Sequence, residues 1–146
     1  MRARGRGADA IPDYGNLALH QTRVLVRARL RHWHGVLASA RKLQRLDPWQ
    51  AAPHVDASAA LFQLSRYEDA AVSLQAAAVL GGGPDVDARL AAVYHTLGDA
   101  AALLVRRHRC RALAALARTF ADAALPAEAM RLAGLTRTAC DDQARP

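Results

Sequence analysis

A leucine followed by a short polar break recurs three times in the chain, and this spacing limits the possible folds more than any other feature. The leucines are Leu30, Leu64 and Leu97, so the two intervals are nearly equal. Trp33 and Tyr67, which follow the first two breaks, are separated by the same interval as Leu30 and Leu64. A period of this length is typical of stacked helix–turn–helix units, which bury their apolar faces against one another.

The second unit shows the helix–turn–helix pattern in full. Pro53 opens its first helix, where the missing N–H costs no hydrogen bond. Ser65-Arg66 forms the turn, and the glycines at 81–83 end the second helix near Leu80. Because the chain is 52% hydrophobic, only 5% aromatic and rich in alanine, we expect closely packed helices and an all-α fold. The second helix carries one apolar stripe at three- and four-residue steps, formed by Ala70, Ala71, Leu74, Ala77 and Ala78.

These residues resemble the tetratricopeptide repeat (TPR), a helical hairpin of about 34 residues with small residues in both helices and an aromatic residue at the turn. The match lies at Ser58, Leu61, Tyr67, Ala70, Leu74 and Ala77 in the second unit, at Leu90, Ala91, Tyr94, Gly98 and Asp99 in the third, and at Trp33 and the "LDP" of residues 46–48 in the first. His20 and His54 are also one repeat interval apart. The resemblance covers about residues 17–116 and implies three hairpins stacked as a right-handed solenoid.

The helical pattern and the resemblance together predict the boundaries. A TPR-like domain is expected over 15–139, with repeats at about 17–50, 51–83 and 84–117. Because a solenoid exposes the apolar face of its last repeat unless something covers it, residues of about 119–138 are expected to form a C-terminal capping helix that starts near Pro126. The basic, glycine-containing residues 1–14 and residues 140–146 are predicted to be disordered tails.

The resemblance also implies where a ligand sits, since the first helix of each repeat lines the concave side of such a solenoid. The family positions that face this groove fall on Gln21, Leu25 and Arg29, on Val55, Ala59, Phe62 and Gln63, and on Ala88, Ala92, His95 and Thr96. This set combines small and apolar residues with a few hydrogen-bonding side chains. It suits an extended peptide or a short helix with apolar anchors.

The net charge of +7 comes almost entirely from arginine, with Lys42 as the single lysine. Two groups are predicted to form a basic face, namely Arg23, Arg27 and Arg31 on one helix and Arg106, Arg107, Arg109 and Arg111 on another. The high arginine content has two possible explanations. One is codon usage in a G+C-rich genome, and the other is a surface that binds an acidic protein partner. Nucleic acid is disfavoured because no aromatic residues interleave with the arginines to stack bases.

No motif for catalysis, for a metal or for a cofactor stands out. His32, His34 and His108 lack the i, i+4 spacing of a ligand pair, and the "GGGP" at 81–84 lacks the Lys and Ser/Thr of a phosphate loop. Cys110 and Cys140 fit a reduced cytosolic chain, with Cys110 as a packing residue and a single disulfide as the open alternative. Because the sequence shows no catalytic motif, we expect that the protein is not an enzyme. Because it shows no secretory signal and no apolar run near the roughly 20 residues of a membrane span, we expect a cytoplasmic protein.

The function implied by the resemblance is that of a protein-binding adaptor or chaperone. The "YEDA" of residues 67–70 and the "QAAAVL" of 75–80 further resemble the small TPR chaperones of bacterial type III secretion systems, which hold a segment of a secreted partner in their groove. Two alternatives stay open. The chain can be a structural scaffold or homodimer that associates through its first helix or its cap, or an arginine-rich, nucleic-acid-associated regulator.

Overall fold

The computed structural model describes residues 14–98 and 101–144, and these form seven α-helices without a strand. In chain order the helices are α2 (Tyr14–Arg29), α3 (Trp33–Leu46), α4 (Ala52–Gln63), α5 (Tyr67–Val79), α6 (Pro84–Leu97), α7 (Ala101–Asp122) and α8 (Pro126–Ala144). The prediction of an all-α protein is confirmed. The tail predicted at 1–14 lies outside the described residues except for Tyr14, which opens α2.

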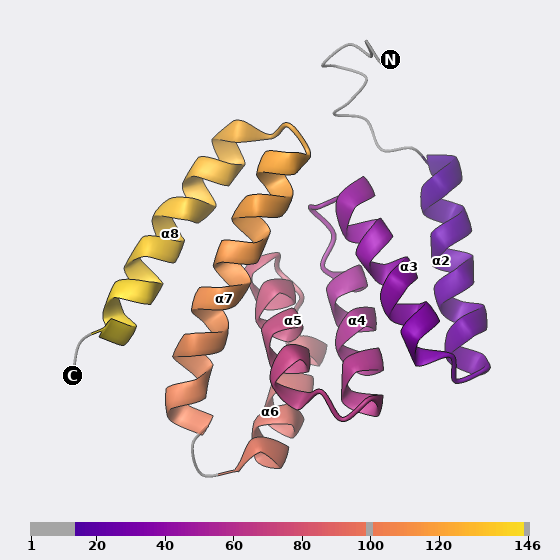
Figure 1. Cartoon of the computed structure of the whole chain (residues 1–146), viewed down its shortest axis with the longest axis horizontal. Coiled ribbons are helices and arrows are strands. Elements are labelled where there is room, and N and C mark those ends of the chain that lie inside the picture. The colour runs from indigo at the N-terminus through magenta and orange to yellow at the C-terminus, as the bar shows by residue number, and fades with distance from the viewer. Residues whose placement is uncertain (1–13, 99–100, 145–146) are drawn as a thin grey trace.

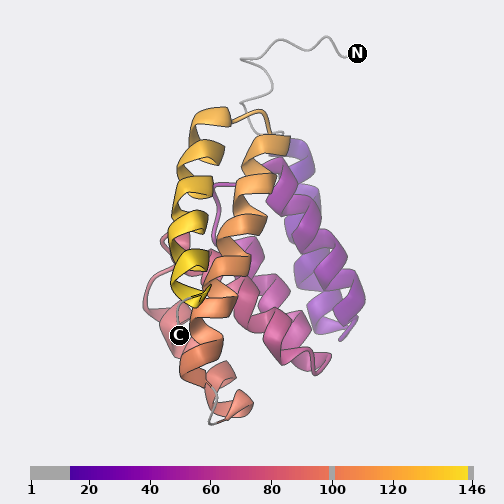
Figure 2. The same cartoon turned by 60° about the vertical axis from the view of Figure 1, so that its left-hand side comes forward.

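Consecutive helices pack side by side from α2 to α5 and form two successive hairpins (Figure 1). The chain then changes pattern at α5, which also contacts α6 and α7. Both views show α8 running alongside α7, on the opposite side of the molecule from α2 (Figures 1 and 2). The helix α5 is therefore the central element that joins the N-terminal hairpins to the C-terminal pair.

The turns of the first two hairpins have the same geometry at positions one repeat interval apart. Arg31 and Ser65 adopt φ values of 57° and 60°, in the left-handed region. The N–H of the residue after each one donates back to the preceding helix, from His32 to the Arg27 carbonyl and from Arg66 to the Leu61 carbonyl, both at 2.8 Å. A left-handed residue with this back-bonding closes a helix and aims the chain into the next one. The sequence period thus corresponds to a repeated turn.

A turn of this kind also ends α5, where Gly81 has a φ of 84° and the Gly82 N–H donates to the Ala77 carbonyl at 2.9 Å, and another lies between α7 and α8. Ala124 has a φ of 59°, and the Leu125 N–H donates to the Phe120 carbonyl at 3.0 Å, as in the first two hairpins. Gly98 was predicted to mark the same turn but has φ 84° and ψ −149°. This backbone region is open essentially only to glycine, so Gly98 directs the chain elsewhere. The helix α7 accordingly packs against α5 and α8.

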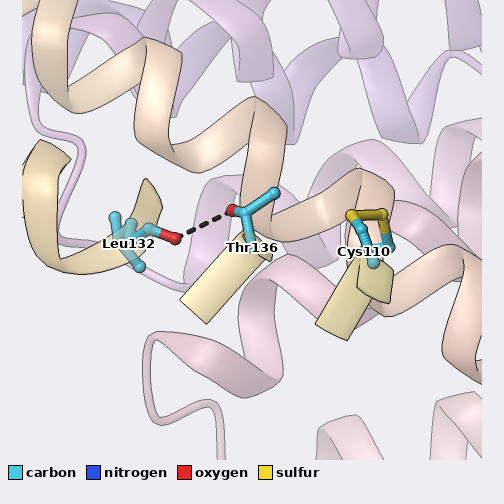
Figure 3. The surroundings of a disulfide bond; sticks show 4 residues. Cys110, Leu132 and Thr136 are labelled. Atoms are coloured by element: carbon cyan, nitrogen blue, oxygen red, sulfur yellow. Dashed lines mark hydrogen bonds between the residues drawn. A yellow bond between two sulfur atoms is a disulfide. The ribbon is translucent and has the colours of Figure 1, made fainter. Parts of the chain in front are cut away.

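The C-terminal end departs from the predicted boundaries. The helix α7 passes through the expected break at Arg118 and ends at Asp122, and α8 then continues to Ala144. The prediction of a disordered tail from residue 140 is wrong, because Cys140 lies in α8 and forms a disulfide with Cys110 of α7, with a Cα–Cα distance of 5.3 Å (Figure 3). The predicted role of Cys110 as an unpaired packing residue is wrong for the same reason.

Two clusters of buried side chains hold the helices together. The first joins α2 to α6 and is built around Leu43, Leu61 and Leu74. The second joins α5, α7 and α8, with Phe120 and Leu132 fully buried. Small residues permit close approach of the helices at the centre, and fully buried alanines occur at 40, 60, 70, 71, 77 and 112.

Arg27 has a structural role that the sequence did not suggest. It was expected to belong to a basic face, but its side chain is half-buried against α3. Its Nη1 donates to the Gly35 carbonyl at 3.1 Å and to the buried Ser39 hydroxyl at 2.9 Å. The side chain crosses α3 over Gly35, where an added Cβ would come within 2.8 Å of the Arg27 Cδ. Arg27 therefore ties α2 to α3.

Replacing Arg27 with Met is expected to lower the free energy of unfolding by about 1–2 kcal/mol, because Met keeps the apolar stem but leaves the buried Ser39 hydroxyl without its partner. Urea unfolding at pH 7 measures this. Arg23→Met is the matched control, since Arg23 lies one turn earlier on α2 and donates no hydrogen bond to any residue of the described ranges; we expect a change within about 0.5 kcal/mol. Equal losses from the two variants would contradict the role of Arg27.

Candidate functional site

Four of the predicted groove residues line one depression between α4 and α6. They are Ala59, Phe62 and Gln63 of α4 and Ala92 of α6, and the depression has a volume of about 200 Å³. We call it the Phe62 groove. Its remaining lining is Ser58, Leu74, Arg89 and Val93. The groove is thus lined mainly by apolar side chains, with Gln63 and Arg89 exposed at its rim.

Phe62 is held in place by a second aromatic ring. Its ring centroid lies 5.0 Å from that of Tyr67, with the planes at 67°, an edge-to-face contact across the α4–α5 turn. Three of the lining residues, Ser58, Leu74 and Val93, are buried. Ser58 donates its hydroxyl hydrogen to the Val55 carbonyl at 2.6 Å, so this polar group is already satisfied within α4. An apolar guest therefore meets no unpaired polar atom from Ser58.

Arg89 is the one charged side chain that lines the groove, and it is paired with Asp85 of the same helix. The Arg89 Nε donates to Asp85 Oδ2 at 2.9 Å on the exposed face of α6. Burial raises the pKa of the nearby Asp56 carboxyl, and the positive charge of Arg89 acts in the opposite direction. Gln63 is exposed, and its amide both donates and accepts hydrogen bonds. The rim can therefore pair with either polar group of a peptide backbone.

The other predicted groove residues do not line this depression. Val55 packs half-buried against the first core cluster. His95 and Thr96 are exposed on α6, and the Thr96 hydroxyl donates to the Ala92 carbonyl of its own helix. The three predicted residues on α2, namely Gln21, Leu25 and Arg29, lie on the outermost helix of the N-terminal hairpin and away from the groove.

A second hollow, which the sequence did not indicate, lies among α3, α4, α5 and α7. It has a volume of about 180 Å³ and adjoins a hollow of about 310 Å³ between α3 and α7, with Arg41, Gln44 and Thr119 lining both. His54 lines the inner hollow and is buried, and burial lowers its pKa to about 4. The one signal for it in the sequence was the His20–His54 interval, which indicated only a repeat.

A buried polar network joins α5, α6 and α7. His108 is fully buried, with Nδ1 3.0 Å from the Tyr94 hydroxyl and Nε2 3.2 Å from Glu68 Oε1. Gln75 donates its amide hydrogen to the same hydroxyl at 3.2 Å. In a consistent arrangement, the Gln75 amide donates to the Tyr94 hydroxyl, the Tyr94 hydroxyl donates to His108 Nδ1, and the His108 Nε2–H donates to Glu68 Oε1. This network fastens α5, α6 and α7 together.

The predicted basic face is partly engaged with acidic residues. Arg111 Nη2 lies 3.6 Å from Asp69 Oδ1, and Arg66 pairs with the same carboxylate at 2.8 Å. Arg106, Arg107 and Arg109 are exposed on α7. The prediction that Arg23 and Arg31 share one helix is wrong, because α2 ends at Arg29 and Arg31 lies in the turn that follows. Within residues 14–98 and 101–144, no three His, Cys, Asp or Glu side chains come together as a metal-binding group would require. In the same described ranges, every helix is too short or too polar to span a bilayer.

Comparison with known proteins does not assign the chain to a class. It matches no protein-family model, no curated protein and no solved structure. The Phe62 groove and the hollows beside α7 are therefore the candidate functional features of this protein.

Proposed function

We propose that this protein is a protein-binding module of the TPR-like helical-repeat class, and that the Phe62 groove seats an apolar side chain from an extended segment or short helix of its partner. The observation that carries this proposal is the convergence of Ala59, Phe62, Gln63 and Ala92 on one depression. Apolar pockets with polar rims are the usual means by which helical surfaces recognise peptides.

The size of the groove favours a side-chain anchor over a cofactor. Sites for small-molecule cofactors typically enclose about 300–1,000 Å³, whereas this depression encloses about 200 Å³. The ring of Phe62 is fixed by Tyr67, so little side-chain freedom is lost on binding. Gln63 at the rim supplies hydrogen bonds to the backbone of the bound segment.

The narrower proposal is a bacterial chaperone of the type III secretion kind, which keeps an apolar segment of a secreted partner soluble. The matching turns at 31 and 65 support a TPR-like repeat for the hairpins α2–α3 and α4–α5. A right-handed solenoid of three such hairpins would have to use α7–α8 as the third. Cytoplasmic placement belongs to this narrower proposal, and the Cys110–Cys140 disulfide weighs against it, because the cytosol keeps most thiols reduced.

A second candidate function is self-association through α2. This outer helix and the turn after it expose apolar side chains at Leu19, Leu25, Val26 and Leu30, with exposed fractions from 45% to 66%. Such a face suits a homodimeric scaffold, and sizing chromatography of Leu25→Glu beside the natural protein tests it. A nucleic-acid-binding role is less well supported, since Arg27 and Arg111 are already engaged within the protein.

Phe62→Glu is expected to weaken binding of peptides selected on an immobilised peptide array by about 10- to 100-fold, because it places a charge where the apolar anchor sits. Fluorescence anisotropy with the selected peptides measures the affinity. Met130→Glu is the matched control, since Met130 is an apolar side chain 75% exposed on α8.

A second variant separates the groove from a folding defect. Ala92→Trp fills the groove from an exposed position on α6 without disturbing the Phe62–Tyr67 contact. It is expected to weaken the same peptides, with an unchanged circular dichroism spectrum. The proposal is wrong if the peptides bind both groove variants as tightly as they bind the natural protein, or if Met130→Glu causes the same loss.

A further inference from the structure

The inner hollow among α3, α4, α5 and α7, which we call the His54 cavity, combines apolar walls with a few polar groups. Its apolar lining comes from all four helices and consists of Leu37, Ala57, Val72, Ala76, Ala112, Ala115 and Leu116. Its polar lining is Arg41, Gln44, His54, Ser73 and Thr119. This combination is typical of small-ligand sites, but the volume of about 180 Å³ is below their usual range of about 300–1,000 Å³, so only a very small ligand fits.

His54 contributes a buried polar atom that lacks a partner. The residue is 7% exposed, and its Nε2 is buried without a hydrogen-bond partner among the described residues. Leaving such an atom unpaired costs about 1–3 kcal/mol. A ligand group that meets Nε2 in the cavity would remove this cost, so the atom marks a point where binding is favourable.

His20 is a useful comparison, because it shows that a buried histidine at this repeat position does not by itself line a cavity. It occupies the equivalent position of the preceding repeat, is buried to a similar extent, and its Nδ1 also lacks a partner among the described residues. However, His20 lines neither the His54 cavity nor the hollow beside it. What distinguishes His54 is therefore the adjoining space.

The charge beside the cavity is positive. Arg41 is the one charged residue in the lining of the His54 cavity, and it also lines the outer hollow together with Arg45 and Asp122. Asp122, the opposing charge, lies only in the outer hollow. With a pKa near 4, His54 is neutral at pH 7 and supplies a hydrogen bond and no charge. An anionic group is therefore favoured on the side of the His54 cavity that Arg41, an exposed residue, lines.

We propose that the His54 cavity binds a short-chain organic monocarboxylate, whose carboxylate accepts a hydrogen bond from His54 Nε2–H and pairs with Arg41 while its alkyl chain lies against Leu37, Val72 and Leu116. At the share of about 30 Å³ that a water molecule takes in the liquid, the cavity accommodates an acid of roughly six non-hydrogen atoms. Butyrate has this size. The site is separate from the Phe62 groove and does not depend on it.

Titration with butyrate tests the proposal, with the imidazole ¹⁵N and ¹H resonances as the readout. We expect the His54 resonances to shift and saturate at about 20 mM or below, which corresponds to a modest affinity. The His20 resonances serve as the internal control and should not move. Propylammonium, which has the same three-carbon alkyl chain and the opposite charge, should leave both histidines unchanged.

Two arginine variants complete the test. Arg41→Gln removes the charge that lines the inner cavity and is expected to weaken butyrate binding by about tenfold or more. Arg45→Gln, which changes only the outer hollow, should alter binding by less than about threefold. The proposal is overturned if butyrate fails to shift His54, if His20 and His54 shift together, or if Arg41→Gln binds as tightly as the natural protein.

Discussion

Reducing the Cys110–Cys140 disulfide is expected to lower the free energy of unfolding by about 3–4 kcal/mol. The bond joins cysteines with a sequence separation of 30, so it closes a long loop in the unfolded chain and removes much of its conformational freedom. In the folded state the same bond joins helices that already lie side by side (Figure 3). Constraint of the unfolded chain therefore stabilises the protein at little cost to the native packing.

Thermal unfolding with and without a reductant measures this effect, and we expect Tm to fall by about 10 °C on reduction. The double variant Cys110→Ser, Cys140→Ser is the matched control. It should unfold near the temperature of the reduced natural protein and should not respond to the reductant. If mass spectrometry shows that the bond has formed and reduction still leaves Tm unchanged, the bond does not stabilise the fold.

This disulfide is also expected to affect the two proposed ligand sites unequally. Cys110 lies on α7, which carries Leu116 and Thr119 of the His54 cavity, whereas the Phe62 groove is built from α4, α5 and α6. If reduction loosens the packing of α7 against α8, we expect the His54 cavity to change more than the Phe62 groove. Redox state and peptide binding should be nearly independent.

The hairpins α2–α3 and α4–α5 could be predicted because their signals are local. A leucine, a polar break and an aromatic residue recur within a few positions, and the turn they specify needs no distant partner. The prediction of Ala59, Phe62 and Gln63 as groove residues came from the resemblance to the TPR, and these three residues lie within two turns of α4.

The C-terminal half could not be predicted in the same way because its determinants are long-range or backbone-specific. Gly98 fits the sequence pattern of a hairpin turn, but glycine permits a backbone conformation that takes the chain elsewhere. The spacing of Cys110 and Cys140 does not say that their helices are adjacent. The His54 cavity draws its lining from four helices, so its residues share no sequence pattern.

Acidification is expected to destabilise the protein through His54, by about 3 kcal/mol between pH 7 and pH 4. Burial lowers the pKa of this imidazole from 6.5 to about 4 in the folded state. Between these two values the unfolded chain binds a proton that the folded protein excludes. The stability contributed by neutral His54 is therefore fully present above pH 6.5 and is lost as the pH falls toward 4.

Urea unfolding of the natural protein and of His54→Gln across this range isolates the effect, since Gln keeps a polar side chain of similar reach and does not titrate. The raised pKa of Asp56 and the lowered pKa of Glu128 act in both proteins, so they cancel in the difference. That difference should shrink by about 3 kcal/mol from pH 7 to pH 4. His95→Gln, at an exposed position on α6, should retain the pH dependence of the natural protein. Parallel curves for the natural protein and His54→Gln would mean that His54 accepts a proton inside the fold, and hence that its cavity admits water or an anion in acid.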